Sequence, residues 1–333
     1  MTSRISLHDW LLQQWYHAPS PHPLLLSLEP VFRGAVLLRQ YAYRAGYRKT
    51  VQLPVPVIVV GNLTVGGVGK TPLVIALAQA LSRMGLRPGI VSRGYGGNGR
   101  GVIPVRVDAT SDPLEVGDEP VLIAHKTGCP VAVARQRAEA GRYLLETADC
   151  NVLIADDGLQ HYALGRDIEI AVVDGLRVFG NGHCLPAGPL REPVNRLEQV
   201  DRVIYSETGP EGQMVMALRG DEAVNLADSS MRRPLADFAG TETYAVAGIG
   251  NPARFFAHLA GFGLNPETQA LPDHHAFRPE DLARPHDWPL FMTEKDAVKC
   301  SAWADARCWY VPVEARLPQG FTESVYQLVV SKM

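Results

Sequence analysis

Apolar residues recur along the chain with two different periods, and each period predicts its own kind of element. Short continuous runs rich in valine and isoleucine, bounded by glycine, proline or polar residues, predict buried strands. Such runs lie at residues 57–60, 90–93, 131–134, 151–157 and 168–174, with later ones at 203–205 and 243–248. In several of the stretches between these runs, apolar residues recur with the spacing of a helix. Strands that alternate with helices predict a parallel sheet covered by helices on both faces, in which ligands bind beyond the carboxyl ends of the strands.

A separate helical pattern precedes the first of these strands. Residues 30–49 predict an amphipathic helix. Its apolar face carries Val31, Ala35, Leu38, Ala42 and Ala45, and Arg33, Gln40 and Arg44 lie opposite. In one interpretation the apolar face packs on the domain core and the basic face is solvated. In the other, the helix lies in the interfacial region of an anionic lipid leaflet, where each Lys or Arg contributes about 1 kcal/mol.

Length and charge narrow the fold and the classes of partner. The chain has 333 residues, more than the roughly 250–300 at which single cores stop growing, so two domains are predicted. Its net charge of −3 argues against nucleic acid as the main partner, because binding to a phosphate backbone requires a strongly basic surface. The charge is unevenly distributed: residues 1–50 carry six basic and two acidic residues, a net of +4.

The five cysteines predict neither disulfides nor a zinc site. Their number is odd and no C-x-x-C pair occurs, which indicates a reducing compartment. No apolar run approaches the roughly 18–20 residues that span a bilayer, and the N-terminal residues do not form a secretory signal. We therefore expect a protein that stays in the cytoplasm.

Candidate chemistry begins at residues 55–72, VPVIVVGNLTVGGVGKTP, where a predicted strand runs into a glycine-rich turn. Glycines let successive backbone N–H groups turn toward a polyphosphate, Lys70 would reach its β and γ phosphates, and the Thr71 hydroxyl would bind Mg²⁺. The common pattern has another glycine five residues before Gly69, where this chain has Thr64. A plain strand-to-helix turn is the alternative.

Acidic residues follow two further segments. Asp156 and Asp157 come directly after a predicted strand, where nucleoside-triphosphate enzymes keep the carboxylate that holds Mg²⁺. Since side chains alternate along a strand, one of the two is expected to face the metal, and we favour Asp157; a simple turn is the alternative. Asp118, in VGDEP, is either a helix cap or a general base that accepts a proton from an attacking hydroxyl.

Two later segments add polar candidates. Residues 181–193, NGHCLPAGPLREP, form a Gly/Pro-rich loop in which Arg191 could contact phosphate and Glu192 a metal; a surface ion pair is the alternative. In PDHHAF, adjacent histidines point apart, so a two-His metal site is not predicted. One histidine oriented by a carboxylate, tuning a base, is the favoured functional interpretation.

Together, several motifs closely resemble those of the tetraacyldisaccharide 4′-kinase family of lipid A biosynthesis. They are GNLTVGGVGKTP, SRGYGG, VGDEP, DDGLQH, LPAGPLREP, DHHAF and TEKDAVK, following a basic N-terminal helix. The resemblance covers nearly the whole chain, and DDGLQH and LPAGPLREP in this order are more specific than the phosphate loop. Val68 stands where threonine is expected in much of the family, which leaves the backbone cradle intact.

The resemblance implies an α/β fold with a P-loop NTPase-type parallel sheet flanked by helices. It adds a second, smaller α/β domain and an N-terminal amphipathic membrane-associated helix. The implied ranges are 1–50 for the basic helical segment, 51–235 for the P-loop kinase core and 236–333 for the smaller domain, which would contribute to the active-site cleft.

The implied activity is phosphorylation of the 4′-hydroxyl of a tetraacylated glucosamine disaccharide 1-phosphate to form lipid IVA, with ATP and Mg²⁺ as cofactors. The implied location is the cytoplasmic face of the bacterial inner membrane, as a peripheral protein. The partners are then a lipid substrate and the membrane surface, with no nucleic acid and no protein partner. A substrate with four acyl chains stays in the bilayer, so the resemblance favours the lipid interpretation of the N-terminal helix.

Residue roles carried over from the family fall into four groups. The ATP site would comprise Asn62, Thr64, Gly66, Gly67, Val68, Gly69, Lys70 and Thr71. Thr71, Asp157 and Glu192 would hold Mg²⁺. Catalysis would use Asp118 as the base, His274 paired with it, and Lys70 and Arg191 on the transferring phosphate. Arg93, Tyr95, Gln160 and His161 would line the substrate site.

Two other function classes remain open. One is a phosphate-loop ATPase whose hydrolysis switches the state of a partner, which predicts ATP turnover without a lipid acceptor. The other is a non-catalytic nucleotide-binding module at membranes. Such a module predicts ATP affinity without turnover, and Asp118 and His274 would then be dispensable.

Overall fold

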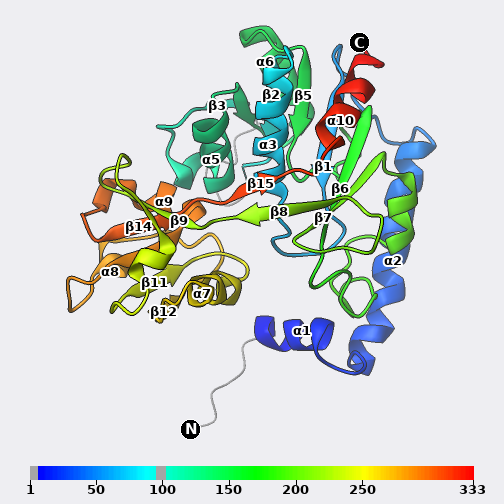
Figure 1. The fold of residues 1–333 in the computed structure, drawn as a ribbon. Coiled ribbons are helices and arrows are strands. Elements are labelled where there is room, and N and C mark those ends of the chain that lie inside the picture. The colour runs from blue at the N-terminus through cyan, green and yellow to red at the C-terminus, as the bar shows by residue number, and fades with distance from the viewer. Residues whose placement is uncertain (1–6, 95–102) are drawn as a thin grey trace. The chain divides into compact units, whose positions relative to one another are not determined.

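The computed structural model describes residues 7–94 and 103–333 (Figure 1). Contacts between residues divide the chain into two compact units, and neither is a single continuous segment. Unit 1 consists of Met1–Lys70, Val152–Ala217 and Leu317–Met333, and unit 2 of Thr71–Asn151 and Leu218–Arg316. Because both units draw on separated segments, contacts within each of them join residues that are far apart in sequence.

Unit 1 is built on a parallel sheet. Its strands are β1 (Val57–Gly61), β5 (Val152–Ala155), β6 (Ile168–Asp174), β7 (Arg202–Ser206) and the start of β8 (Val215–Arg219). They lie in the order β8-β7-β6-β1-β5, and every neighbouring pair is parallel. All residues of β1, β5 and β6 are buried, as expected of parallel strands covered on both faces. Side chains that follow β1 and β5 therefore meet at one edge.

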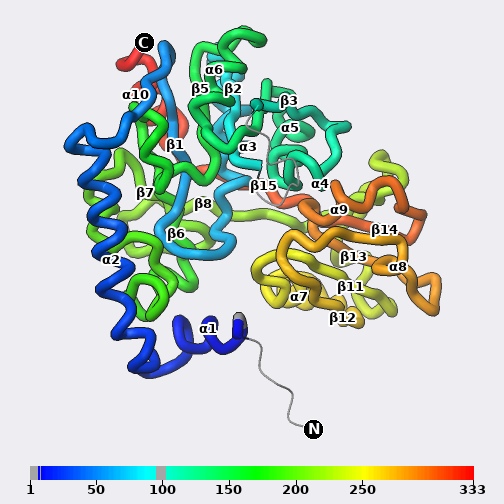
Figure 2. Tube along the Cα trace, turned by 180° about the vertical axis from the view of Figure 1, so that it is seen from behind, coloured from blue at the N-terminus to red at the C-terminus, as the bar shows by residue number. Residues whose placement is uncertain are grey.

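The helical elements of unit 1 come from both ends of the chain and from the segment after β6. They are α1 (Leu7–Tyr16), α2 (Pro23–Arg44), the short 3-10 helix η1 (Val194–Gln199) and α10 (Phe321–Val330). Helix α10 buries Phe321, Val325 and Val329 completely. In Figure 2 the long helix α2 runs beside the segment between β6 and β7.

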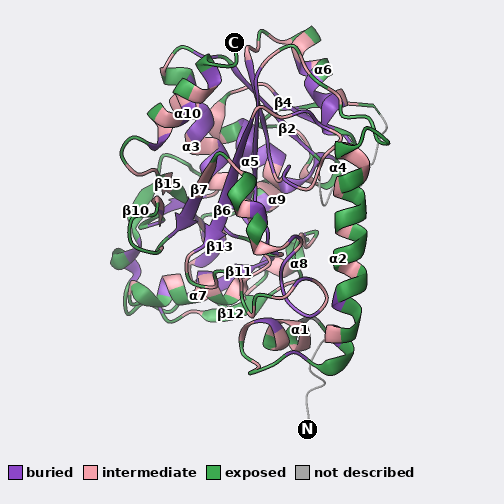
Figure 3. Cartoon of the chain, turned by 90° about the vertical axis from the view of Figure 1, so that its right-hand side faces the viewer, coloured by how far each residue is buried: buried purple, intermediate pink, exposed green. Residues whose placement is uncertain are grey.

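Helix α2 begins earlier than the sequence pattern predicts. It starts at Pro23 rather than Pro30, because the His22 ring accepts a hydrogen bond from the Leu24 N–H and caps the helix, and Pro23 suits the first turn. Much of its surface is exposed (Figure 3). The exposed apolar side chains include Leu24, Leu28, Val31 and Leu38, of which Val31 is 71% and Leu38 68% exposed. The predicted apolar face therefore does not pack on the core.

Unit 2 contributes three paired strands and several helices from its N-terminal segment. Strand β2 (Pro88–Ser92) pairs in parallel with β4 (Val131–Val133), and β3 (Val105–Val107) pairs antiparallel with β4. The helices here are α3 (Lys70–Arg83), α4 (Pro113–Val116), α5 (Asp118–Thr127) and α6 (Arg137–Thr147). Since β2 and β4 are buried along their whole length, only β3 presents a partly exposed edge.

The rest of unit 2 is a six-stranded sheet in the order β10-β9-β14-β13-β11-β12. Its strands are β9 (Glu222–Asn225), β10 (Arg232–Pro234), β11 (Tyr244–Ala247), β12 (Glu267–Ala270), β13 (Leu290–Thr293) and β14 (Cys308–Val311). The accompanying elements are η2 (Leu235–Phe238), α7 (Pro252–Gly261), α8 (Pro279–Leu282), α9 (Glu294–Cys300), η3 (Ser301–Trp303) and the strand β15 (Glu314–Arg316). Strands β11, β12, β13 and β14 are parallel.

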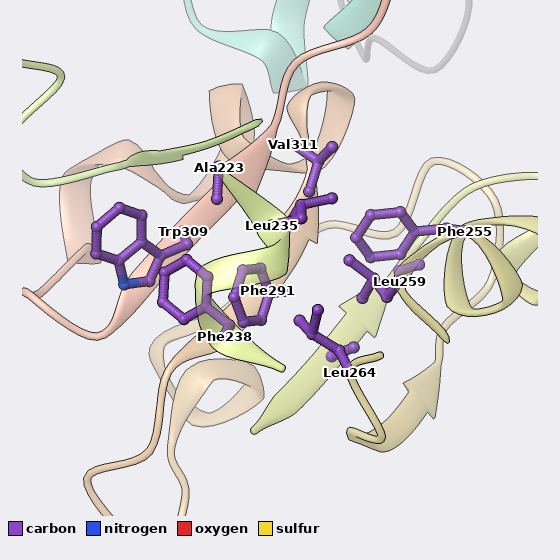
Figure 4. Close-up of a cluster of buried hydrophobic side chains, with 11 residues drawn as sticks. Ala223, Leu235, Phe238, Phe255, Leu259, Leu264, Phe291, Trp309 and Val311 are labelled. Atoms are coloured by element: carbon purple, nitrogen blue, oxygen red, sulfur yellow. The ribbon is translucent and has the colours of Figure 1, made fainter. Parts of the chain in front are cut away.

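An aromatic cluster packs against one face of this sheet (Figure 4). The Phe238 ring packs edge-on against Phe291 and Trp309, with centroids 5.0 and 5.2 Å apart. Leu235, Leu259 and other fully buried side chains complete the cluster. Edge-to-face aromatic pairs add about 0.5–1.5 kcal/mol each beyond the area they bury, so this cluster gives the C-terminal half of unit 2 its own core.

The predicted α/β class with mainly parallel sheets is confirmed. The predicted strands at residues 57–60, 90–93, 131–134 and 168–174 correspond to β1, β2, β4 and β6, with shifts of one or two residues at their ends. Across the described ranges 7–94 and 103–333, no helix has the length and apolar character needed to cross a membrane.

Candidate active site

A glycine-rich loop joins β1 to α3, in the order strand, loop, helix. Gly66 and Gly69 adopt φ angles of 103° and 92°, a region that residues with a side chain rarely enter. Helix α3 begins directly afterwards at Lys70. A loop of this kind aims backbone N–H groups and the positive end of the helix dipole toward the same point, which favours an anion.

The Lys70 side chain contacts Asn62 and Asp157. Its Nζ lies 3.0 Å from Asn62 Oδ1 and 3.4 Å from Asp157 Oδ1, and 13% of the side chain is exposed. Asn62 is completely buried, and its Nδ2 donates to the Thr64 carbonyl at 2.7 Å and to Thr64 Oγ1 at 3.3 Å. Thr64, at the position where a glycine is common, therefore takes part in orienting Lys70 through Asn62.

Asp157 lies beyond the end of β5 and carries two cationic partners. Arg191 Nη1 is 3.2 Å from both of its carboxylate oxygens, in addition to the contact with Lys70. Asp157 has a φ of 47°, one of four positive values among the described non-glycine residues, and such backbone strain is concentrated at functional sites. Asp156 is 1% exposed, whereas one third of the Asp157 side chain is exposed.

Glu192 is buried and surrounded by hydrogen-bond donors. Oε1 accepts hydrogen bonds from Gln40 Nε2 at 3.0 Å and from the Tyr162 hydroxyl, and Oε2 accepts one from Gln160 Nε2 at 3.1 Å. Burial and the charge of Glu192 raise the pKa of Tyr162, so its hydroxyl keeps its proton and acts as a donor. The donors around Glu192 thus fix the orientation of its carboxylate.

The side-chain oxygen atoms near the glycine-rich loop suit a magnesium ion rather than a transition metal. Within residues 7–94 and 103–333, no group of three or more His, Cys, Asp or Glu side chains could hold a metal alone. Magnesium is bound through oxygen, by one or two carboxylates together with waters and substrate phosphates. Asp157 and Glu192 supply carboxylates in unit 1, and Thr71, the second residue of α3, carries a hydroxyl.

A second cluster of site residues lies in unit 2, around Asp118. The Asp118 side chain is 3% exposed, and His274 Nδ1 lies 3.2 Å from each of its oxygens. Gly117 occupies the N-cap position of α5 without a side-chain cap, so Asp118 does not act as the N-cap residue. His274 has a φ of 57°, the second site residue with this strained backbone.

Two lysines of α9 complete this cluster. Lys299 Nζ is 3.6 Å and Lys295 Nζ 3.9 Å from Asp118, and Lys295 also contacts Glu119 and Asp273. Burial raises the pKa of the Asp118 carboxyl, but the hydrogen bond from His274 and the positive charges of Lys295, His274 and Lys299 outweigh it, and the net shift is downward. Asp118 is therefore an ionised acceptor at neutral pH.

The same pair predicts a titration signature for His274. The hydrogen bond to Asp118 raises its pKa above the usual 6.5, against opposing effects of burial and Lys295. A raised pKa adds stability that is fully present below pH 6.5 and is lost as pH rises through the pKa of the folded state. We expect NMR titration of the His274 ring to give a midpoint above 6.5 in the wild type. In Asp118→Asn the midpoint should fall toward 6.5; an unchanged midpoint would show that the pair is not coupled.

The remaining predicted residues are distributed over both units. Gln160 contacts Asn62 and Arg191 as well as Glu192. His161, half-buried, follows it and accepts a hydrogen bond from Arg166 at its carbonyl. Arg93 is exposed just after β2. Tyr95 lies outside the described residues.

Several residues that contact the site were not among the predicted site residues, and they include Gln40, Tyr162, Lys295 and Lys299. A signal for the lysines exists in TEKDAVK, because an i,i+4 pair on a helix faces one side. Gln40 was expected on the solvated face of its helix. It is half-buried instead, since the inward face of α2 runs through Leu25, Glu29 and Gln40.

Three comparisons relate the chain to known proteins. A family model described as tetraacyldisaccharide-1-P 4′-kinase (LpxK) matches residues 21–330. A relative named tetraacyldisaccharide 4′-kinase from Nitrosococcus oceani is 50% identical over 319 residues, which cover 96% of this chain and 94% of the relative. One of the same name from Alkalilimnicola ehrlichii is 52% identical over 297 residues, 88% of each chain. A crystal structure of LpxK from Aquifex aeolicus in complex with ATP matches with a TM-score of 0.76 and 27% identity, over 92% of this chain and 97% of that chain.

Proposed function

The chain belongs to the tetraacyldisaccharide-1-P 4′-kinase family, and from this premise we propose how its residues carry out phosphoryl transfer. The reaction is ATP-dependent phosphorylation of the 4′-hydroxyl of a tetraacyldisaccharide 1-phosphate in lipid A biosynthesis. Phosphoryl transfer depends mainly on positioning and on neutralising charge. The observation that carries the proposal is the convergence of Lys70, Asp157, Arg191 and Glu192 around the glycine-rich loop.

The glycine-rich loop and Lys70 bind the phosphates of ATP in this proposal. Asn62, Thr64, Gly66, Gly67, Val68 and Gly69 form the cradle, with Thr71 at its end. Lys70 exchanges its contact with Asp157 for the β and γ phosphates, while Asn62 continues to orient it. Lysine acts here as a compact charge on a flexible stem, which suits a group that changes partners.

Magnesium would be held by Asp157, Glu192 and Thr71. When bound, the ion supplies Lewis-acid neutralisation of the charge on the β and γ phosphates. Glu192 is oriented for this by the donors from Tyr162 and Gln160. Arg191, which neighbours Glu192 and contacts Asp157, is then placed to stabilise the transferring phosphoryl group with its planar guanidinium.

Asp118 takes the proton from the 4′-hydroxyl as that oxygen attacks the γ-phosphorus, and the bond between the γ-phosphorus and the departing ADP breaks. His274, hydrogen-bonded to Asp118, orients the carboxylate and stabilises its charge. The two lysines of α9 keep Asp118 ionised. A base of low pKa accepts the proton only as the new P–O bond forms, which suits a loose transition state. Arg93, Tyr95, Gln160 and His161 are the residues we propose to line the acceptor site.

The exposed apolar face of α2 would bind the cytoplasmic leaflet of the inner membrane. The exposed apolar side chains on this face are Leu24, Leu28, Val31 and Leu38. The segment up to residue 50 is basic. Exposed apolar side chains beside Lys and Arg are typical of interfacial helices. The substrate of this family carries four acyl chains, so an enzyme that reaches it at the surface of the bilayer needs such a face.

Replacing Val31 and Leu38 together by aspartate should weaken binding to anionic vesicles by at least about 10-fold, because each apolar side chain contributes about 1.5–3 kcal/mol when buried. Flotation of protein with vesicles measures the bound fraction. The matched control is Leu176→Asp, at another exposed leucine of unit 1 (69% exposed). Flotation of the double variant at the wild-type level would remove the lipid interpretation of this face.

The reaction itself is tested with γ-labelled ATP and tetraacyldisaccharide 1-phosphate in mixed micelles. The proposal requires label in the lipid product, in amounts that rise with enzyme. Free labelled phosphate without labelled lipid would indicate a switch ATPase instead. Binding of ATP with neither product would indicate a nucleotide-binding module.

A further inference from the structure

Helix α2 contacts the Gly/Pro-rich loop, residues 181–193, at two places. Near the start of the loop, the carboxylate of Glu29 lies 2.7 Å from His183 Nδ1 and accepts a hydrogen bond from the Cys184 N–H at 2.9 Å. Near its end, Gln40 Nε2 donates to Glu192. Glu29 and Gln40 are separated by about three helical turns, roughly 16 Å along the axis. One continuous helix therefore contacts the loop near both of its ends.

The contact at Gln40 is specific in its chemistry. Its Nε2 lies 3.0 Å from Glu192 Oε1 and 3.1 Å from the Tyr162 hydroxyl, which donates to the same carboxylate oxygen. An amide carries no charge at any ordinary pH, so Gln40 can hold the carboxylate without neutralising it. Since Glu192 is 1% exposed, rotation of its carboxylate would leave buried oxygens without these donors.

The Gly/Pro-rich loop, residues 181–193, is joined to the glycine-rich loop by backbone hydrogen bonds. The Arg191 N–H donates to the Leu63 carbonyl at 2.6 Å, and the Val65 N–H donates to the Pro189 carbonyl at 2.9 Å. Thr64 and Leu190 form a β-bridge between the two segments. A continuous series of contacts in unit 1 thus runs from α2 to the backbone beside Lys70.

We propose that Gln40 is a positioning residue for Glu192 and that it couples docking of α2 on a lipid surface to the binding of Mg²⁺·ATP. The face of α2 that carries Gln40 is turned toward Glu192, and a different face carries the exposed apolar side chains. When the helix is fixed on a lipid surface, the Gln40 side chain can adopt fewer positions. The Glu192 carboxylate, which Gln40 contacts, is then restricted as well. This inference rests on the proposed function, in which Glu192 is a magnesium ligand and α2 meets the membrane.

Coupling of this kind is reciprocal. If lipid binding strengthens Mg²⁺·ATP binding by some factor, Mg²⁺·ATP must strengthen lipid binding by the same factor. Coupling free energies between sites usually correspond to about 5–150-fold in affinity. The effect can therefore be measured as vesicle binding, without any turnover.

The experiment uses the full chain and vesicles that contain anionic phospholipid, with and without Mg²⁺ and a non-hydrolysable ATP analogue. For the wild type we expect the nucleotide to raise the vesicle partition coefficient about 5-fold or more. Gln40→Leu keeps the side-chain volume and the apolar face, so its binding without nucleotide should match the wild type and the rise should disappear. The same change at an exposed site, Gln213→Leu, is the control.

A second measurement follows the metal directly. Loss of a residue that holds a metal ligand usually costs about 10–100-fold in metal affinity, so Gln40→Leu should raise the Mg²⁺ concentration for half-maximal nucleotide binding about 10-fold. Tyr162→Phe removes the other donor to Oε1. If both act through Glu192, the double variant should lose less than the product of the two single effects.

The outcomes separate this inference from the proposed function. A Gln40→Leu protein that keeps both the nucleotide-dependent rise and the wild-type Mg²⁺ requirement would overturn the inference, and label transfer to lipid by the wild type would still stand. Wild-type vesicle binding that ignores the nucleotide would overturn the coupling alone. If the wild type binds no vesicles but phosphorylates the lipid in detergent micelles, both the coupling and the lipid role of α2 are wrong, while the kinase assignment remains.

Discussion

Asp118→Asn is expected to lower kcat about 10²- to 10⁴-fold, the usual contribution of a general base, while the affinity for ATP changes little. Asparagine keeps the shape of the side chain and can still accept a hydrogen bond from His274, but it cannot take the proton from the 4′-hydroxyl. Its uncharged amide also loses the attraction of the two α9 lysines. Transfer of label from ATP to the lipid, with ATP binding measured separately, gives both quantities.

The control for this substitution is Asp149→Asn, which changes an aspartate of unit 2 whose side chain is 83% exposed and pairs with Arg87. Exposed ion pairs of this kind contribute only about 0–1 kcal/mol, so kcat should stay near the wild-type value. A folded Asp118→Asn protein with wild-type kcat would show that another group accepts the proton. It would also remove the base assignment while leaving the phosphate site intact.

Lys70→Met is expected to reduce kcat about 10²- to 10³-fold, the range found when one preorganised donor to a developing charge is removed. Methionine retains part of the apolar stem but loses the ammonium that lies between Asn62 and Asp157. Binding of ATP should weaken as well, because the lysine contacts the phosphates before and during transfer. Steady-state kinetics with varied ATP separate the two effects.

Lys332→Met serves as the matched control, since Lys332 is an exposed lysine of the same unit. It should behave as the wild type. Near-normal turnover by Lys70→Met would mean that the glycine-rich loop and Arg191 suffice for the γ-phosphate. The role proposed for Lys70 on the transferring phosphate would then have to be abandoned.

The meeting of Lys70 with Asp157 could be predicted from the sequence, and the reason is topological. Both residues follow strands of one parallel sheet, β1 and β5, which are neighbours, and parallel strands bring their carboxyl ends to one edge. Local pattern is enough for such a prediction, because buried valine and isoleucine runs mark the strands and glycine marks the turn.

The contacts of Glu192 and Gln40 could not be predicted in the same way. Periodicity shows that α2 has an apolar face but does not say which face the rest of the protein covers, so Gln40 was grouped with the exposed arginines. Its half-buried position depends on the path of residues 181–193, an irregular segment whose course is set by long-range hydrogen bonds such as those of Glu29 and Trp15. The pairing of Asp118 with His274 came from the family resemblance, since 156 positions separate them.

Helix α10 lies after all of unit 2 in the sequence, yet its fully buried Phe321, Val325 and Val329 belong to unit 1. Synthesis on the ribosome proceeds from the N-terminus, and domains generally fold as their residues emerge. The segment that carries the glycine-rich loop must therefore wait, with part of its hydrophobic core open, until residues beyond 316 have left the ribosome. A ribosome stalled within unit 2 would therefore hold an exposed apolar surface of unit 1 for chaperones to cover.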